Sequence, residues 1–321
     1  MDISENTTVF KTEAEKRLDR FLIDRFPRYS RTYFQFLIEE GCVLKNSQKA
    51  KKSEKLKEGD EIEILFRLTP EITLEPENIP LDVLFEDEHI LAVNKPSGLV
   101  VHPAPGNWSH TFVNALLYHC QKKALSASKN LPENLRPGIV HRLDKETSGV
   151  LLSAKTETAQ RFLIGLFAKR AVQKEYLAVV FGRAEAQTEL TAPIGRDPHC
   201  RKLMRIDPLG KSAETHFICL AQDDKLSLVS AKPRSGRTHQ IRVHLKHLKT
   251  PILGDAGYGF KKANQAYGAL RPLLHAYKIK FCHPVSKKTI ELTAPIPADF
   301  QFFIDRLKAQ KLFQTPLPER V

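Results

Sequence analysis

Residues 137–154 have the sequence PGIVHRLDKETSGVLLSA, in which a polar loop runs directly into an apolar stretch. The apolar residues from Val150 to Ala154 predict a short buried strand. The loop before it carries Asp144 between Arg142 and Lys145, and loops at strand ends are where protein scaffolds usually present reactive groups. Neighbouring cations favour the ionised form of a carboxylate, so Asp144 could serve as a nucleophile or base. An ordinary surface ion pair in a turn is the alternative.

A second polar stretch, SGRTHQIRVH at residues 235–244, predicts a helix that continues to about Leu248, with Thr238 as its N-cap. Helical spacing gives this segment a polar stripe of His239, Arg242 and Lys246 and an apolar stripe of Ile241, Leu245 and Leu248. The polar stripe and the open helix N-terminus would suit an anion. A plain amphipathic helix would show the same apolar stripe, so the pattern leaves both interpretations open.

Short predicted strands outnumber helices from residue 81 onward, and they often follow one another directly. We expect strands at residues 83–85, 90–94, 150–154, 175–181, 213–220 and 226–232, and helices at residues 111–119, 158–169 and 238–248. This succession predicts an α+β domain with a mixed, largely antiparallel sheet and not a doubly wound one. Tyr176 enters one of these strands, where a tyrosine is either a stacking or acid–base group or a core residue.

The first 70 residues predict a small, separate α/β domain. Helices are expected at residues 13–26 and 31–40, and strands at residues 42–45 and 61–65. Prolines 70, 76 and 80 stand among acidic residues and predict a linker at residues 71–80. The chain of 321 residues is therefore expected to hold a small domain at residues 1–70 and a larger one at residues 81–321.

The chain carries 50 Lys and Arg against 37 Asp and Glu, a net charge of +13. Such an excess favours a polyanionic partner, although a basic surface also serves solubility alone. In the small domain, the basic residues expected to contact nucleic-acid phosphates are Arg31, Lys45, Lys49, Lys51 and Lys52. A solvated loop without a partner is the alternative.

Several classes of chemistry lack their sequence motifs. There is no phosphate-binding loop of a nucleotide hydrolase, no dinucleotide-binding glycine motif and no zinc-deaminase signature. The five cysteines are far apart and include no C-x-x-C pair, so we expect reduced thiols, no metal and no cofactor. The N-terminus has no basic stretch leading into an apolar one, and no later stretch approaches the roughly 20 apolar residues of a membrane span, which predicts a cytoplasmic protein.

Motifs in the order of the chain resemble the RluA family of pseudouridine synthases. They are NKPSGLVVH at residues 94–102, HRLDKETSG at 141–149, KEY at 174–176, GRTHQIRVH at 236–244, PILGD at 251–255 and LHA at 274–276. Residues 1–70 resemble the small RNA-binding domain named after ribosomal protein S-four. Residues 80–83 and 102–106 are most similar to the RluD subgroup, which acts on large-subunit ribosomal RNA.

The resemblance implies an enzyme that isomerises uridine to pseudouridine in structured RNA, with large-subunit ribosomal RNA as the expected partner. It implies that Asp144 is the catalytic carboxylate, that Arg242 pairs with it and that Tyr176 is placed against the target base. Arg142 is similar to the family arginine that helps to fill the space left by a flipped base. We expect Arg237 and His239 to contact the RNA, and we expect a monomer that needs no cofactor.

Two other classes of protein remain open on the sequence. A ribosome-assembly factor that binds RNA without catalysis would have the same surfaces, although Asp144, Tyr176 and Arg242 together argue against it. A glycosidase or nucleoside hydrolase usually needs two acidic groups. Only Asp144 is clearly placed for such chemistry, because Glu146 lies in the same loop and Asp255 follows Leu-Gly in a turn.

Overall fold

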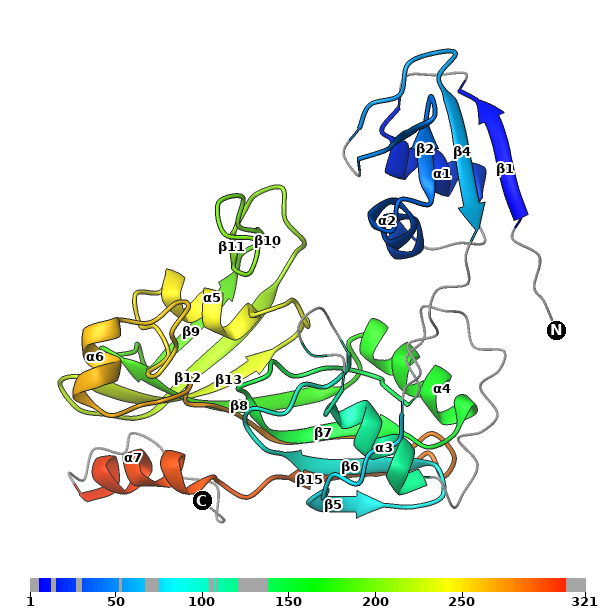
Figure 1. Cartoon of the computed structure of the whole chain (residues 1–321). Helices are drawn as coiled ribbons and strands as arrows, with labels where there is room; N and C mark the ends of the chain where they lie inside the picture. The colour runs from blue at the N-terminus through cyan, green and yellow to red at the C-terminus, as the bar shows by residue number, and fades with distance from the viewer. Residues whose placement is uncertain are drawn as a thin grey trace. The chain divides into compact units, whose positions relative to one another are not determined.

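The computed structural model describes residues 6–12, 16–26, 31–51, 54–66, 75–103, 107, 109–120 and 138–309. The described residues up to Phe66 belong to one compact unit, and those from Glu75 onward belong to a second, larger one (Figure 1). The domain boundary predicted at residue 70 falls between these ranges, outside the described residues.

The first unit packs two helices on a four-stranded antiparallel sheet of order β1-β4-β2-β3. Its elements are β1 (Asn6–Lys11), α1 (Leu18–Arg25), α2 (Arg31–Glu39), β2 (Val43–Lys45), β3 (Gln48–Lys49) and β4 (Glu61–Phe66). Leu22 of α1, Phe34 of α2 and Ile62 of β4 lie in one buried core. Both predicted helices and both predicted strands are present, but the first helix begins at Leu18, after the non-helical residues 16 and 17. The edge strands β1 and β3 were not predicted.

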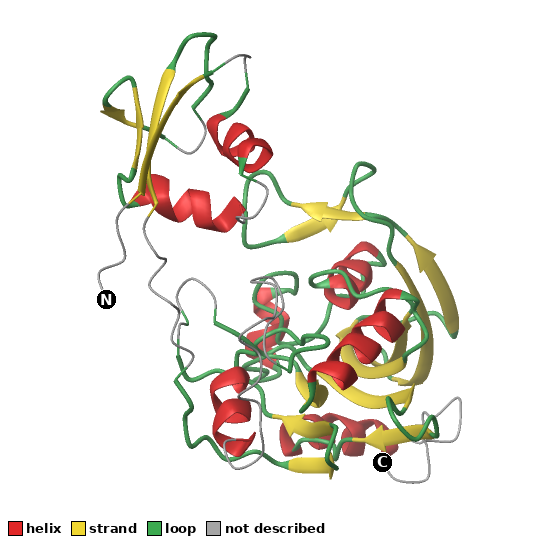
Figure 2. Cartoon of the chain, turned by 90° about the vertical axis from the view of Figure 1, so that its right-hand side faces the viewer, coloured by secondary structure: helices red, strands yellow, loops and turns green. Residues whose placement is uncertain are grey.

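The second unit is built on a nine-stranded sheet, which confirms the α+β class and the mixed, largely antiparallel sheet (Figure 2). The path through the sheet is β5 (Val83–Glu86), β6 (Ile90–Lys95), β7 (Ser148–Ala154), β14 (Leu274–Cys282), β8 (Gln173–Phe181), β13 (Leu226–Pro233), β12 (Glu214–Gln222) and β9 (Gln187–Thr191), with β15 (Thr289–Thr293) beside β14. Within this sheet, β7 and β14 are parallel and the other named pairs are antiparallel.

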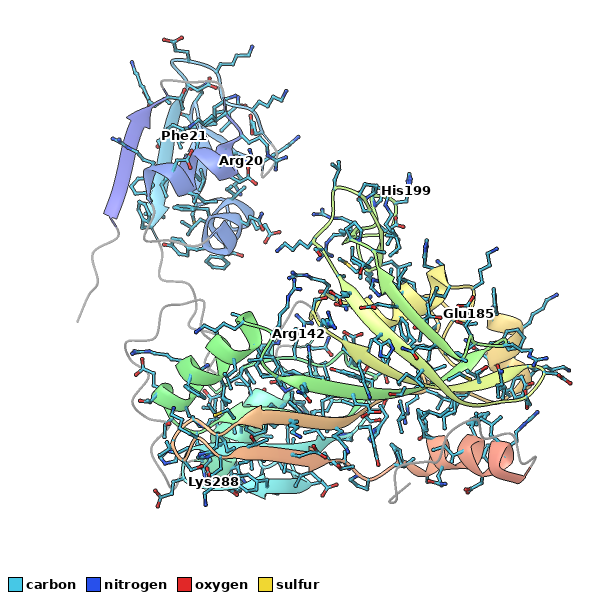
Figure 3. All side chains as sticks on the ribbon, turned by 180° about the vertical axis from the view of Figure 1, so that it is seen from behind. Arg20, Phe21, Arg142, Glu185, His199 and Lys288 are labelled. Carbon is cyan, nitrogen blue, oxygen red and sulfur yellow. The ribbon has the colours of Figure 1, made fainter. Side chains whose placement is uncertain are left out.

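Five helices and a separate two-stranded ribbon complete the described part of this unit. The helices are α3 (Phe112–Cys120), α4 (Glu157–Ala168), α5 (Gln240–His247), α6 (Lys261–Ala266) and α7 (Ala298–Ala309). The ribbon pairs β10 (Ile194–Arg196) with β11 (Met204–Ile206), and Figure 3 shows His199 at its tip.

Alternation along the strands assigns each helix to a face of the sheet. Val150, Leu152 and Ala154 of β7 pack in the same core as α4, whereas Leu151 packs in the core of α3. In β8, Ala178 and Val180 share a core with α5, whereas Leu177 and Val179 share one with α7. Successive strand residues point to opposite faces, so both strands are covered on both sides and read as nearly continuous apolar runs. Tyr176 packs against the α3 and the α5 cores, and therefore lies between them.

The parallel contact between β7 and β14 explains one glycine of the HRLDKETSG motif. Gly149 has a φ of 109° and pairs with Ala276. A Cβ atom at Gly149 would lie 2.2 Å from the carbonyl oxygen of Ala276, which no other residue can accommodate. Glycine thus allows the strand that follows the Asp144 loop to pair closely with the centre of the sheet.

The described part of the predicted linker is attached to the second unit. The side-chain amide of Asn114 in α3 donates to the carbonyl of Glu75 at 2.8 Å, and the N–H of Glu77 donates to the carbonyl of Asn114 at 3.0 Å. Residues 75–80 form neither helix nor strand, and the N–H of Ile79 donates to the carbonyl of Glu77 at 2.8 Å. Across the described ranges of both units, no helix has the length and apolar character to cross a bilayer.

Candidate active site

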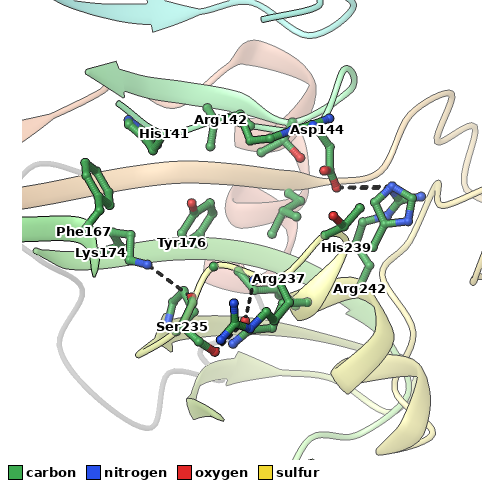
Figure 4. A pocket seen from close by; sticks show the side chains of 18 of the residues that line it. His141, Arg142, Asp144, Phe167, Lys174, Tyr176, Ser235, Arg237, His239 and Arg242 are labelled. Atoms are coloured by element: carbon green, nitrogen blue, oxygen red, sulfur yellow. Dashed lines mark hydrogen bonds and ion pairs between the residues drawn. The ribbon is translucent and has the colours of Figure 1, made fainter. Parts of the chain in front are cut away.

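A pocket of about 330 Å³ lies in the second unit, where three segments of the chain meet (Figure 4). It is lined by the loop before β7, by the start of β8 with the end of α4, and by the segment from the end of β13 into α5. The lining residues are Val140, His141, Arg142, Leu143, Asp144, Thr147, Phe167, Lys174, Tyr176, Pro233, Arg234, Ser235, Gly236, Arg237, Thr238, His239, Gln240, Ile241, Arg242 and Leu274. Asp144 is the single carboxylate among them, and five of the others are Lys or Arg.

The cation that contacts Asp144 is Arg242, which is 98 residues away in the chain. Nη1 of Arg242 lies 3.2 Å from Oδ2 of Asp144, and Nε2 of His239 lies 3.9 Å from the same oxygen. Arg142 and Lys145 flank Asp144 in the sequence, but both are exposed and neither forms an ion pair with it among the described residues. The charge partner is therefore supplied by the fold and not by the sequence neighbours.

Arg242 is held from behind by a second carboxylate. Its Nε and Nη2 atoms donate to Asp255 at 2.7 and 2.9 Å, and Asp255 is fully buried. Asp255 Oδ1 also accepts the backbone N–H groups of Gly257 and Tyr258 at 2.9 and 3.0 Å. Burial by itself would lower the pKa of Arg242, but the hydrogen bonds and charge of Asp255, together with Asp144, raise it. The structural role expected for Asp255 is thus to orient a guanidinium through a planar two-bond contact.

A buried lysine fixes the Asp144 loop. Lys95 is fully buried, and its Nζ donates to the carbonyl oxygens of Pro96, Leu99 and Lys145 at 2.7, 2.9 and 2.9 Å. Burial lowers the pKa of Lys95 to about 7, while the charge of Glu146 opposes this shift. Three carbonyl acceptors match the three N–H donors of an ammonium group. The sequence contained Lys95 in the NKPSGLVVH motif but gave no sign of this contact, because Lys145 is 50 residues away.

Tyr176 extends into the middle of the pocket from β8. Burial, followed by the charge of Asp144, raises the pKa of its hydroxyl well above the ordinary value, so the group keeps its proton at neutral pH. Tyr176 can therefore offer a ring face and a hydroxyl donor.

Three residues of the pocket lining, His141, Phe167 and Lys174, were not predicted individually. The ring of His141 stacks on Phe167 with centroids 4.8 Å apart, and its Nε2 accepts the N–H of Leu152 at 2.9 Å. Burial lowers the pKa of His141 to about 3, which keeps the ring neutral. Lys174 donates to the carbonyl of Ser235 at 3.2 Å, and burial lowers its pKa to about 8. The HRLDKETSG and KEY motifs were the available signals for His141 and Lys174, whereas no motif included Phe167.

The predicted cap of the 238–248 helix is wrong by one residue. Helix α5 begins at Gln240, and its N-cap is His239 in a left-handed conformation with no side-chain capping bond. The side chain of Gln240 folds back instead and accepts the N–H of Arg237 at 3.0 Å and the hydroxyl of Ser235 at 2.8 Å. Thr238 therefore lies outside the helix. The two stripes are as predicted, because Ile241 and Leu245 are buried while Arg242 and Lys246 both lie over the ring of Tyr258.

The predicted RNA-contacting residues fall into two groups. Arg142, Arg237 and His239 line the pocket, and Arg237 also donates to the carbonyl of Ser212 at 3.1 Å. In the first unit, Lys49 and Lys51 are exposed, whereas Lys45 is only partly exposed and forms ion pairs with Asp60 and Glu54 at 3.0 and 3.5 Å. Lys52 and the side chain of Arg31 lie outside the described residues.

The described residues contain no cluster of three or more His, Cys, Asp or Glu side chains that could hold a metal ion. All five cysteines are free thiols in the structure.

Comparisons with known proteins agree with the geometry. A family model described as RNA pseudouridylate synthase matches residues 89–247. The ribosomal large subunit pseudouridine synthase D of Zymomonas mobilis is 41% identical over 314 residues, which cover 95% of this chain and 98% of the relative. An uncharacterized RNA pseudouridine synthase of Aquifex aeolicus is 42% identical over 312 residues, 94% of this chain and 96% of the relative.

Among solved structures, Human RNA Pseudouridylate Synthase Domain Containing 4 has the same fold, with a TM-score of 0.56 and 24% identity over 74% of this chain and 95% of that chain.

On the identity to its sequence relatives, the chain belongs to the RNA pseudouridylate synthase family. It is an isomerase that converts uridine to pseudouridine in RNA, and the predicted resemblance to the RluA family is confirmed.

Proposed function

We propose that this enzyme modifies uridines of large-subunit ribosomal RNA and that Asp144 is its catalytic carboxylate. The ribosomal assignment is supported by relatives named ribosomal large subunit pseudouridine synthase D, two of which are matched over 98% and 93% of their lengths. The observation that supports the residue assignment is the ion pair of 3.2 Å between Asp144 and Arg242, in a pocket lined by no other carboxylate. A pair of catalytic acids, as in a glycosidase, is missing from this lining.

The reaction breaks the bond from ribose C1′ to uracil N1 and joins C1′ to C5, while the proton of C5 is replaced by one on N1. The product is an isomer of the substrate, so the overall reaction consumes no oxidant, reductant or co-reactant. Asp144 acts either as a nucleophile, toward the ribose or the base, or as an anion that stabilises positive charge on the ribose. Arg242 orients the carboxylate for either route through a charge-assisted hydrogen bond.

Tyr176 provides the surface on which the freed base is held. Its ring packs between the α3 and α5 cores and borders the pocket beside Asp144. A base that has been flipped out of an RNA stack loses a few kcal/mol of stacking energy, which an aromatic ring can partly replace. Arg142 lies exposed at the edge of the same pocket and is placed to occupy the space left by the base.

Basic side chains outside the pocket supply the contacts to the RNA backbone. In the first unit these are the exposed Lys49 and Lys51. In the second unit, the β10–β11 ribbon presents exposed Arg201, Lys202 and Arg205 around the tip marked by His199 (Figure 3). Phosphate contacts of this kind add affinity without sequence selectivity. On this proposal the enzyme works as a monomer in the cytoplasm and needs no cofactor.

Mapping pseudouridines in total RNA from cells with and without the gene tests the substrate assignment. We expect one or more sites in large-subunit ribosomal RNA to lose the modification when the gene is removed and to regain it when the gene is restored. A gene carrying Asp144→Asn should not restore it. Loss confined to transfer RNA would overturn the ribosomal assignment while leaving the catalytic one intact.

A further inference from the structure

His239 has an unusual backbone at the edge of the pocket. Its φ is 56°, in the left-handed region that residues other than glycine rarely adopt. Such conformations are strained and persist where the surroundings hold them in place. Here the surroundings are the start of α5 on one side and the ring of Tyr258 on the other, with ring centroids 5.6 Å apart in an edge-to-face arrangement.

The contacts of Tyr258 favour one of the two nitrogens of His239 as the carrier of the proton. The Tyr258 hydroxyl accepts the N–H of Met204 at 2.7 Å and lies 2.8 Å from Nδ1 of His239. A hydroxyl has a single proton to donate, and no other described residue is placed to accept it from Tyr258. This arrangement favours Tyr258 as the donor to Nδ1, because its hydroxyl then accepts one hydrogen bond and donates one within the protein. In a neutral imidazole whose Nδ1 is an acceptor, the proton resides on Nε2.

The neutral form of His239 is favoured at physiological pH. Burial lowers its pKa, and the charges of Arg242 and Arg142 lower it further, against the opposing charges of Asp144 and Asp255. The geometry and the charges thus agree on a neutral ring with the proton on Nε2.

The described part of the chain provides no hydrogen-bond acceptor for the Nε2–H group. Oδ2 of Asp144 lies 3.9 Å from Nε2, which is beyond hydrogen-bonding distance. Among the described residues, Nε2 forms no hydrogen bond. The side chain of His239 is 18% exposed and lines the pocket. A fixed donor thus faces the space beside the carboxylate proposed to do the chemistry.

We propose that His239 is a further catalytic residue, whose Nε2–H donates a hydrogen bond to a carbonyl oxygen of the flipped uracil. This inference rests on the proposed function, because it takes the pocket around Asp144 as the uridine site. When the bond from C1′ to N1 breaks, its electron pair stays with uracil and is shared by N1 and the carbonyl oxygens. If Asp144 instead adds to the ring, the added charge also lies on a carbonyl oxygen. His239 keeps its proton in both routes, and the same electron pair later forms the bond from C5 to C1′.

A neutral donor with a fixed direction suits this task. Donors aimed at an oxygen where charge develops stabilise the transition state more than the ground state. A neutral imidazole stabilises such an oxygen without an additional full positive charge beside Arg242. The contact to Tyr258 prevents the ring from placing its proton on Nδ1, where it would face away from the substrate.

Single-turnover rates of three variants test the proposal. His239→Asn tolerates the left-handed backbone but loses the donor at Nε2. His239→Gln retains an N–H at about the reach of Nε2, and Tyr258→Phe removes the group that fixes the tautomer. We expect the rate of His239→Asn to fall by roughly 10²- to 10³-fold, as on removal of an oxyanion donor, with RNA affinity unchanged. His239→Gln should recover part of this loss, and Tyr258→Phe should show a smaller loss. His216→Asn, outside the pocket, is the control and should retain the parent rate.

A substrate analogue distinguishes a contact with uracil from a merely structural role. RNA with 2-thiouridine or 4-thiouridine at the target carries a sulfur in place of one carbonyl oxygen, and sulfur accepts hydrogen bonds weakly. One of the two analogues should slow the parent enzyme and leave His239→Asn unaffected. Equal slowing of both enzymes by both analogues, or an unchanged rate of His239→Asn on normal RNA, would overturn the inference. Asp144→Asn in the same assay tests the proposed function separately, since its activity does not depend on whether His239 donates.

Discussion

The guanidinium of Arg242 forms its two-bond contact with Asp255, at 2.7 and 2.9 Å, and reaches Asp144 at 3.2 Å through the remaining nitrogen. Arg242 therefore connects a fully buried carboxylate to a partly exposed one. The buried pair fixes the plane of the guanidinium, and the third nitrogen then points to one position in the pocket. Asp255 thus contributes to the orientation of Asp144 without touching the substrate.

Replacing Asp255 by Asn should destabilise the protein and slow catalysis. The change removes the charge of a buried pair and leaves Arg242 uncompensated on that side, which typically costs about 3 kcal/mol or more in unfolding free energy. The rate of the chemical step should fall more than the affinity for RNA. Denaturant titration and single-turnover kinetics measure the two effects.

Asp299→Asn is the matched control for this experiment. Asp299 also receives two bonds from an arginine, Arg271, at 2.6 and 2.7 Å, but its side chain is 49% exposed. An exposed pair contributes at most about 1 kcal/mol. Equal losses of stability in both variants would contradict the special position assigned to Asp255.

Removing residues 1–70 should weaken action on folded ribosomal RNA more than it weakens the stability of the remainder. The first unit has its own core and its own sheet, and the second unit begins with residues attached to α3. The melting temperature of the truncated protein should stay close to that of the parent, while kcat/KM on ribosomal RNA falls and its dependence on salt becomes shallower. Unchanged kcat/KM on this substrate would show that the first unit has no role in RNA binding.

Acid should destabilise the fold through His275, which is fully buried on β14. Burial lowers its pKa to about 4, below the value of about 6.5 expected in the unfolded chain. Between these values the unfolded state binds more protons than the folded state, so stability falls as pH falls. One such histidine costs about 2 kcal/mol at pH 5 relative to pH 7.

Other groups titrate in the same range, so the measurement is the difference between the parent and His275→Gln, whose unfolding free energy should decline less from pH 7 to pH 5. Equal declines in the unfolding free energies of the two proteins would show that groups other than His275 cause the acid sensitivity.

The local sequence pattern predicted much of the fold, and the features that it did not predict share a common cause. Strands such as β7, β8 and β13 are apolar runs bounded by turns, and their burial could be predicted from a few adjacent residues. The central strand β14 alternates with lysines at 278 and 280 and was not predicted as a strand, although its first three residues form the LHA motif. Its parallel pairing with β7 joins residues that are more than 120 positions apart, and no local signal carries that information.

The candidate site likewise combines residues that the sequence predicted with contacts that it could not predict. Asp144, Tyr176 and Arg242 could be named from motifs, and the fold brings all three to one pocket. The supporting contacts could not be predicted, because Lys95 acts on a loop 50 residues away and Tyr258 acts on the tautomer of His239. The type of a side chain and its position in a turn do not indicate which distant atom it will contact.

The most direct test of the account is the single-turnover rate of Asp144→Asn on its RNA substrate, measured free of host enzyme. Asparagine keeps the size of the side chain and its ability to accept a hydrogen bond from Arg242, but it removes the negative charge. We predict an affinity for RNA within about tenfold of the parent, a difference of ~1.4 kcal/mol, and no detectable pseudouridine. Formation of pseudouridine at even a modest fraction of the parent rate would show that Asp144 is not the catalytic group.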